Sequence, residues 1–268
     1  MRPDEKRIPQ DARVSTITLT NKEIDLRAST LPTVWGEKLV MRIVDKSKKT
    51  AKLNELGIEG TNEELILRQL DYPNGIILNT GPTGSGKTAT LYAALDHINT
   101  VDVNIITYED PVENKMDGLS QSQIRADIGY TFAQGLRAAL RQDPDIIMVG
   151  EIRDKETIDM AMEAAMTGHL VFSTIHTNSS AETITRVLNL GAKAFMIAGT
   201  FNFVMAQRLS RKVCTKCAQE VDMKEDKQYF RAREEVSRIQ KESLVNEMKK
   251  RRIDQTQWQR FLDGKLMI

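Results

Sequence analysis

The spacing of hydrophobic residues along the chain changes near residue 75. Before this point, residues 14–20, 24–30 and 37–44 alternate apolar and polar side chains and are separated by short turns. This alternation predicts three antiparallel strands. Three such strands bury too little apolar surface to be stable alone, so we expect residues 1–48 to be part of a small N-terminal β domain.

Short apolar runs alternate with helical patterns after residue 75. The predicted strands are residues 75–80, 103–109, 145–150 and 169–175, and the predicted helices are 87–98, 131–142, 155–166 and 179–190. Strands that alternate with helices favour an α/β fold with a parallel sheet and helices on both faces. We therefore predict an α/β core over residues 75–212. In such sheets ligands bind beyond the carboxyl ends of the strands.

Two further segments flank this core. Residues 49–74 begin with a lysine-rich stretch and then favour a short helix over 62–70, so a linker followed by a helix is expected. Residues 213–268 are mostly charged and helix-favouring, which predicts a helical tail. Its basic run, Lys249–Arg252, has no interleaved aromatic residues and is interpreted as a solvated helix face.

Composition narrows the class of protein. Lysine and arginine number 38 against 37 aspartate and glutamate, a balance that predicts no dedicated nucleic-acid or acidic-lipid surface. No apolar run approaches the roughly 18 residues that a membrane helix needs, and the polar N-terminus does not resemble a signal peptide. A cytosolic protein is expected, in which two cysteines do not form a disulfide framework.

The segment GPTGSGKT, residues 81–88, matches the pattern G-x-x-x-x-G-K-S/T at every position and lies between a predicted strand and a predicted helix. Its glycines allow backbone N–H groups to face a phosphate, and the N-terminus of the following helix adds positive potential. Lys87 can reach the β and γ phosphates, and the hydroxyl of Thr88 can bind Mg²⁺. The residues predicted to bind the nucleotide are Gly81, Pro82, Thr83, Gly84, Ser85, Gly86, Lys87 and Thr88.

Acidic residues follow two of the predicted strands. Hydrolysis requires a group that positions or deprotonates water, and Glu109, Asp110 and Glu113 stand at the end of the strand over 103–109. Three carboxylates so close together fit a cation site, but they also fit an ordinary proline-bent surface loop. The strand over 145–150 ends in Gly150 and Glu151, where a nucleotide-hydrolysing protein normally has an aspartate that holds Mg²⁺.

Two of the three histidines flank the strand over 169–175. His176 lies beyond its carboxyl end, where it could meet a γ phosphate. His169 lies at its start, where a packing or hydrogen-bonding role is expected.

Together these segments resemble the type II secretion and type IV pilus assembly ATPases of the secretion-ATPase superfamily. The resemblance is carried, in order along the chain, by residues 25–45, 81–88, 107–114, 140–154, 167–178 and 206–217. It implies a RecA-like P-loop NTPase core after a partial PAS-like β domain, and ATP hydrolysis with Mg²⁺ that drives assembly of a type IV pilus or a type II secretion pseudopilus. It also implies a homo-hexameric ring in the cytoplasm, held at the inner membrane by a platform protein without inserting into the membrane.

The resemblance also implies roles for individual residues. Glu151 would take the place of the usual aspartate and reach the Mg²⁺ shell partly through water, beside Thr88, which the phosphate-loop motif already predicts as a metal ligand. Glu113 matches the family's favoured base, and Glu109, which its strand-end position favours, is kept as the runner-up. Lys87 is expected to act on the phosphates, and the resemblance implies that His176 contacts or senses the γ phosphate.

Arg27 and Arg42 match arginines of the family's N-terminal domain that approach the nucleotide as the domains close. Without the resemblance, both would be interpreted as ordinary solvent-facing strand residues. Arg137 and Arg208 match family positions without a firm role.

The chain departs from the family pattern at several positions. Ala12 stands where glycine is usual, Trp35 where histidine is common and Tyr108 where valine or isoleucine is usual, and none of these binds phosphate. The family carries two C-x-x-C pairs that bind zinc, whereas Cys214 and Cys217 supply only half of a four-ligand site. Zn²⁺ is therefore expected only in a longer chain with a second pair.

A fragment cut at both ends is the simplest account of this pattern, and a natural short form with a vestigial pair is the alternative. A redox role for the pair lacks a thioredoxin-like setting. Three rival functions stay open: a pilus retraction ATPase, a nucleotide-gated binding module with little hydrolysis, and, more distantly, a small-molecule kinase.

Overall fold

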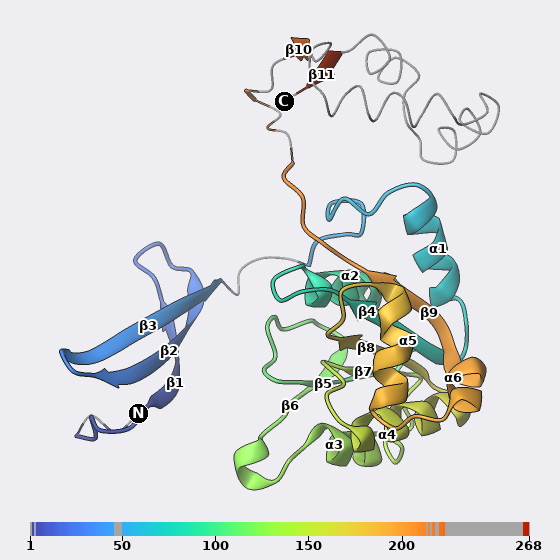
Figure 1. The fold of residues 1–268 in the computed structure, drawn as a ribbon, viewed down its shortest axis with the longest axis horizontal. Helices are drawn as coiled ribbons and strands as arrows, with labels where there is room; N and C mark the ends of the chain where they lie inside the picture. Colours follow the sequence, from blue (N-terminus) through green and yellow to red (C-terminus); the bar gives the residue numbers. More distant parts are fainter. Residues whose placement is uncertain are drawn as a thin grey trace.

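The computed structural model describes residues 2, 4–45, 50–212, 214, 216–217, 220–222 and 265–267. A three-stranded antiparallel sheet forms one layer, and an α/β core lies beside it (Figure 1). The predicted helical tail, including Lys249–Arg252, falls mostly outside the described residues. The part of it that is described pairs strand β10 (Glu220–Asp222) with strand β11 (Lys265–Met267).

The N-terminal sheet is the predicted meander. Its strands are β1 (Gln10–Ile17), β2 (Glu23–Thr33) and β3 (Gly36–Asp45), each antiparallel to the next. The first strand lies earlier than predicted, because its ladder with β2 extends back to the pair Gln10 and Thr30. Residues 18–21 form the turn instead, where the Thr18 N–H donates to Lys22 O and the Thr18 carbonyl accepts from the Asn21 N–H.

Three arginines lie directly opposite one another across this sheet. Arg13 on β1 pairs with Arg27 on β2, which pairs with Arg42 on β3. Directly opposed residues in antiparallel strands point to the same face, so the three side chains share one face of the sheet. That face contacts the core, because Arg13 donates to Gln123 Oε1 at 2.9 Å.

The core sheet has six parallel strands in the order β6-β5-β7-β8-β4-β9. They are β4 (Gly75–Thr80), β5 (Ile105–Glu109), β6 (Leu119–Gln123), β7 (Ile146–Val149), β8 (Leu170–Ile175) and β9 (Phe201–Ala206). Every residue of β4, β5, β7 and β8 is buried, as expected for inner strands covered on both faces. These four were predicted. The edge strands β6 and β9 were not, because β6 is a polar run and β9 follows helix α6 directly.

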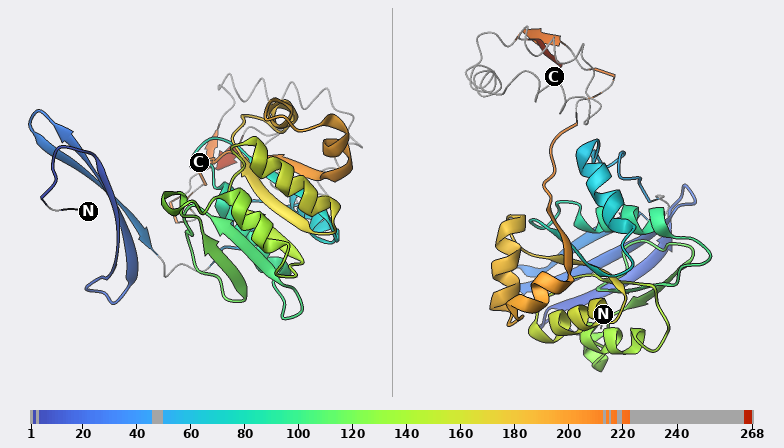
Figure 2. Two further views of the ribbon diagram at one scale, coloured as in Figure 1. Left: turned by 90° about the horizontal axis from the view of Figure 1, so that it is seen from below. Right: turned by 90° about the vertical axis from the view of Figure 1, so that its right-hand side faces the viewer.

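Helices cover both faces of this sheet (Figure 2). The helices are α1 (Thr61–Leu70), α2 (Lys87–Ile98), α3 (Phe132–Ala139), α4 (Lys155–Met166), α5 (Ser180–Asn189) and α6 (Ala194–Thr200), and a 3₁₀ turn, η1, covers Ala126–Ile128. Helices α1 and α2 pack on one face and α3 to α6 on the other, in two separate buried clusters. The predicted α/β class with a parallel sheet is confirmed.

Substitution of Phe172 tests whether the core is packed as described. Its side chain is fully buried on β8, in the cluster beneath α1 and α2. We expect Phe172→Ala to lower the free energy of unfolding by about 3–5 kcal/mol, because the lost ring leaves a cavity. Urea denaturation measures the change. Phe195→Ala is the matched control: Phe195 is 69% exposed, so its loss should stay within about 0.5 kcal/mol. Equal losses in the two variants would contradict the assigned core.

Candidate active site

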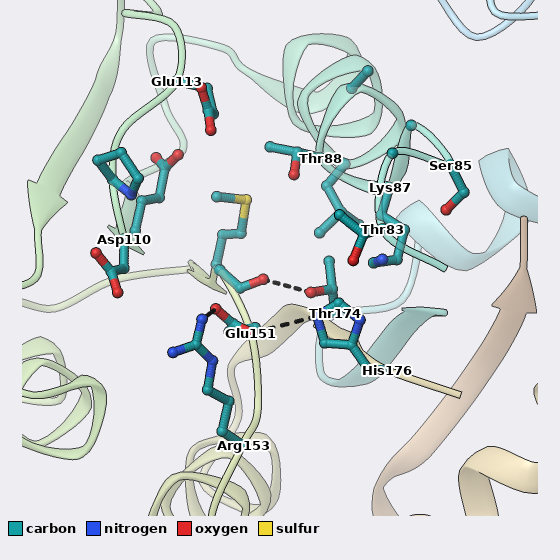
Figure 3. A pocket seen from close by; sticks show the side chains of 18 of the residues that line it. Thr83, Ser85, Lys87, Thr88, Asp110, Glu113, Glu151, Arg153, Thr174 and His176 are labelled. Atoms are coloured by element: carbon teal, nitrogen blue, oxygen red, sulfur yellow. Dashed lines mark hydrogen bonds and ion pairs between the residues drawn. The ribbon is translucent and has the colours of Figure 1, made fainter. Parts of the chain in front are cut away.

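A cleft of about 720 Å³ lies at the carboxyl ends of β4, β5, β7 and β8 (Figure 3). Side chains from all four strand ends line it, and Arg27 and Arg42 reach it from the N-terminal sheet. Of the residues predicted to bind nucleotide or act in catalysis, all but Gly81 and Pro82 line this cleft. The structure therefore brings together side chains that are far apart in the sequence.

The phosphate loop joins β4 to α2 and packs tightly against the chain after β9. Gln207 donates its backbone N–H to Thr80 O at 2.8 Å. A Cβ on Gly81 would lie 2.3 Å from the carbonyl oxygen of Gln207, and Gly81 has a φ of +143°. Only glycine fits both restraints. The Gln207 side chain also accepts hydrogen bonds from Asn79 at 3.0 Å and Thr90 at 2.8 Å, so it braces both ends of the loop.

Lys87 begins α2 and is folded back onto the loop. Its buried Nζ donates to Gly81 O at 2.8 Å and to Pro82 O at 3.1 Å. Burial lowers the pKa of Lys87, and the nearby charge of Glu151 offsets part of that shift. In the described part of the chain the buried Ser85 hydroxyl has no hydrogen-bond partner. A phosphate chain would offer acceptors to both groups, so the residues present fit a polyphosphate ligand.

Glu151 follows β7 and lies between Arg153 and His176 in the cleft (Figure 3). One carboxylate oxygen pairs with the Arg153 guanidinium, and the other lies 3.5 Å from His176 Nε2. Gly150 is fixed just before it, because its N–H donates to Tyr108 O at 2.8 Å and its carbonyl accepts from Thr174 Oγ1 at 2.7 Å. Arg153 was not expected from the sequence to have a role in the site, although it stands two residues after the strand-end glutamate.

The described residues contain no cluster of three or more histidine, cysteine, aspartate or glutamate side chains able to hold a metal. A threonine hydroxyl and one carboxylate, Thr88 and Glu151, suit Mg²⁺, which keeps several waters and takes phosphate oxygens as further ligands. Cys214 and Cys217 are exposed and not joined by a disulfide, and their assignment as half of a zinc site stays a prediction.

The two candidate bases have different surroundings. Glu109 is 2% exposed and accepts hydrogen bonds from Tyr92, from Thr107 at 2.6 Å and from Gln121 at 3.1 Å. The Glu113 side chain is 40% exposed and pairs with Arg27 through two hydrogen bonds of 2.7 and 3.2 Å. Most of the hydrogen-bonding capacity of Glu109 is therefore used within the fold, whereas Glu113 is held from across the cleft.

The remaining singled-out residues lie outside the cleft lining. His169 Nδ1 lies 2.8 Å from Ala164 O at the end of α4, which confirms its predicted hydrogen-bonding role. Arg137 pairs with Glu156 on the surface, and Arg208 donates to Asn178 O at 3.0 Å.

Comparison with known families gives one match along most of the chain. The family model described as "Type II/IV secretion system protein" matches residues 2–256. The type IV pilus assembly ATPase PilB of Pseudomonas aeruginosa is 54% identical over 216 residues, which cover 81% of this chain and 38% of that protein. The type II secretion system ATPase E of Vibrio cholerae is 46% identical over 227 residues, which cover 84% of this chain and 45% of that protein. The chain thus spans less than half the length of these relatives.

Solved structures of related ATPases share the fold, including the following two. The pilus retraction motor PilT with bound ADP superposes with a TM-score of 0.66 at 31% identity, covering 78% of this chain and 61% of that one. The Legionella pneumophila ATPase DotB gives a TM-score of 0.63 at 28% identity, covering 75% of this chain and 58% of that one. The sequence-based recognition of the family is confirmed.

Proposed function

Because the chain belongs to the type II/IV secretion system protein family, we propose that it is a Mg²⁺-dependent ATPase that drives assembly of a type IV pilus or a type II secretion pseudopilus. One observation carries this proposal: a single cleft gathers residues 83–88 of the phosphate loop, carboxylates from two further strand ends and two arginines from the N-terminal sheet. Phosphoryl transfer needs little from a protein beyond positioning and neutralisation of charge, and this set supplies both.

Four of the residues that line the cleft have distinct parts in binding the nucleotide and Mg²⁺ in the proposed reaction. Lys87 exchanges the carbonyls of Gly81 and Pro82 for the β and γ phosphates of ATP. Thr88 and Glu151, the latter partly through water, would hold Mg²⁺, which neutralises charge on those phosphates when bound. His176, which lies beside Glu151, would contact or sense the γ phosphate.

Glu113 is the proposed base that orients and deprotonates the attacking water. Its pairing with Arg27 keeps its carboxylate occupied until a phosphate competes for the guanidinium. Arg27 would then turn to the phosphate with Arg42 beside it. This movement would close the N-terminal sheet over the nucleotide and free Glu113. Closure and reopening of this sheet would supply the mechanical stroke.

The proposed setting is a ring of six copies in the cytoplasm, attached to the inner membrane through a platform protein. None of the helices that the structure describes has the length and hydrophobicity that a membrane crossing requires. In this ring, residues 1–48 would act as the moving β domain and residues 75–212 as the ATPase core, with 49–74 between them.

A pilus retraction motor is the second candidate, because PilT shares the fold. The assembly role is favoured over it by sequence: the pilus assembly ATPase PilB is 54% identical to this chain, against 31% for PilT. A nucleotide-gated module with little hydrolysis is the rival from another class of protein. The effect of substituting Glu113 on turnover distinguishes this module from an ATPase.

Two substitutions separate binding from hydrolysis. Lys87→Ala removes the ammonium that faces the phosphates, so we expect the Kd for ATP, measured by calorimetry, to rise at least about tenfold. Glu113→Gln keeps the shape but not the base, so the Kd should stay within about threefold while turnover falls by roughly 10²–10⁴. Excess EDTA should stop turnover in the unaltered chain.

The matched controls are Lys193→Ala and Glu163→Gln, which change the same residue types at exposed positions outside the cleft. Both variants should leave the Kd for ATP and the turnover unchanged. Glu113→Gln turning over at the unaltered rate would overturn the catalytic assignment.

Assembly into a ring is tested by the rate of ATP hydrolysis per chain as protein concentration increases. If neighbouring copies complete one another's sites, specific activity should rise with concentration and level off as the ring forms, with light scattering reporting the mass in parallel. A specific activity that is independent of concentration while ATP is still hydrolysed would argue against shared sites in this chain.

A further inference from the structure

A buried tyrosine links the phosphate-loop helix to the backbone of the proposed base. Tyr92 lies on α2, which begins at Lys87, and only 2% of it is exposed. Its hydroxyl donates to Glu109 Oε2 and accepts the backbone N–H of Glu113 at 3.3 Å. One hydroxyl therefore contacts both candidate bases, Glu109 at the end of β5 and Glu113 four residues later.

Glu109 is the centre of a hydrogen-bond network around this hydroxyl. Its Oε1 accepts from Thr107 Oγ1 at 2.6 Å and from Gln121 Nε2 at 3.1 Å, while its Oε2 accepts from Tyr92. A carboxylate has about four acceptor positions, and three are used here by side chains of the protein. Such a group has little capacity left to accept a proton from water.

Gln121 extends the network to the far side of the same loop. Besides donating to Glu109, it donates to Asn114 O at 2.9 Å and accepts the backbone N–H of Met116 at 2.7 Å. The backbone on both sides of the Glu113 side chain is therefore fixed by residues that Glu109 holds in place.

The protonation of Tyr92 supports a fixed role for it. Burial, followed by the adjacent Glu109 charge, raises the pKa of Tyr92 far above its ordinary value. A raised pKa keeps the phenol neutral at every pH at which the protein would work, so the hydroxyl remains a donor to Glu109.

We propose that Tyr92, Glu109 and Gln121 form a buried clamp that positions Glu113, and that Glu109 is a positioning residue rather than the base. This inference rests on the proposed function. Since α2 starts with the two residues that would bind phosphate and Mg²⁺, the clamp also ties the position of the nucleotide to that of the base. A displacement of α2 on nucleotide binding would be passed to Glu113 through one hydroxyl group.

The test compares Tyr92→Phe, Glu109→Gln and the double variant in the full chain, using steady-state ATP hydrolysis and amide-resolved hydrogen exchange. Tyr92→Phe keeps the buried ring and removes only the hydroxyl. We expect kcat to fall by about 10- to 100-fold while KM for ATP changes less than about threefold, because the base is displaced but the phosphate loop is intact. Exchange of the Glu113 amide should accelerate about tenfold, while the Met116 amide, held by Gln121, stays protected.

Glu109→Gln should lower kcat by a similar factor, and less than Glu113→Gln does. The double variant should be no slower than the slower single variant, because residues that act as a unit are not additive. Tyr130→Phe is the matched control: its hydroxyl also has one side-chain partner, Ser122 at 2.7 Å, but that partner lies on the edge strand β6 and is neither Glu109 nor Glu113. It should leave kcat and both amides unchanged.

The outcomes that overturn the clamp differ from those that overturn the ATPase assignment. If the chain hydrolyses ATP, Glu109→Gln is as damaging as a lost base, and Tyr92→Phe is silent, then Glu109 is the base and the clamp is wrong. Unchanged exchange of the Glu113 amide in Tyr92→Phe would also refute it. If the unaltered chain does not hydrolyse ATP, the proposed function fails, and the exchange measurement still decides whether the clamp exists.

Discussion

The charged groups at the carboxyl edge of the parallel sheet are stable because each has a partner close by. Lys87 is held by two loop carbonyls, Glu109 by three donors and Glu151 by Arg153. Removing charge from water is costly unless hydrogen bonds or an opposite charge replace the solvent. Away from this edge the four inner strands are mostly apolar on both faces, so this edge is where the core can accommodate such groups.

The same constraint explains how the N-terminal sheet meets the core. Three arginines in register on one face repel one another unless acids or dipoles come between them. Asp25 from the same sheet pairs with Arg13, and Glu113 from the core pairs with Arg27. The contact between the two sheets thus depends on charges that a phosphate would redistribute. This is why nucleotide binding and movement of the N-terminal sheet are coupled in the proposed mechanism.

Local sequence patterns were sufficient to predict those elements whose structure depends mainly on residues close together in the chain. The phosphate loop and the four inner strands each have a motif or an apolar run of their own. The edge strands β6 and β9 escaped prediction, because an edge strand is defined by what it pairs with and not by a hydrophobic run.

Long-range contacts account for what could not be predicted at the site. Arg27 and Glu113 are 86 positions apart, and only a family resemblance suggested that both belong to one site. Tyr92 and Gln121 have no local signal at all, since one reads as a helix core residue and the other as a polar edge residue. The proposed choice of Glu113 over Glu109 as the base rests on the partners of the two side chains, which the sequence does not show.

The most direct test of this account is a crystal structure of the chain with Mg²⁺ and a non-hydrolysable ATP analogue. In the proposed mechanism the triphosphate occupies the loop over residues 81–88, Lys87 Nζ leaves the carbonyls of Gly81 and Pro82 for phosphate oxygens, and Arg27 separates from Glu113. A nucleotide bound elsewhere, or one bound at the loop with Lys87 still on those carbonyls and the Arg27–Glu113 pair intact, would contradict it.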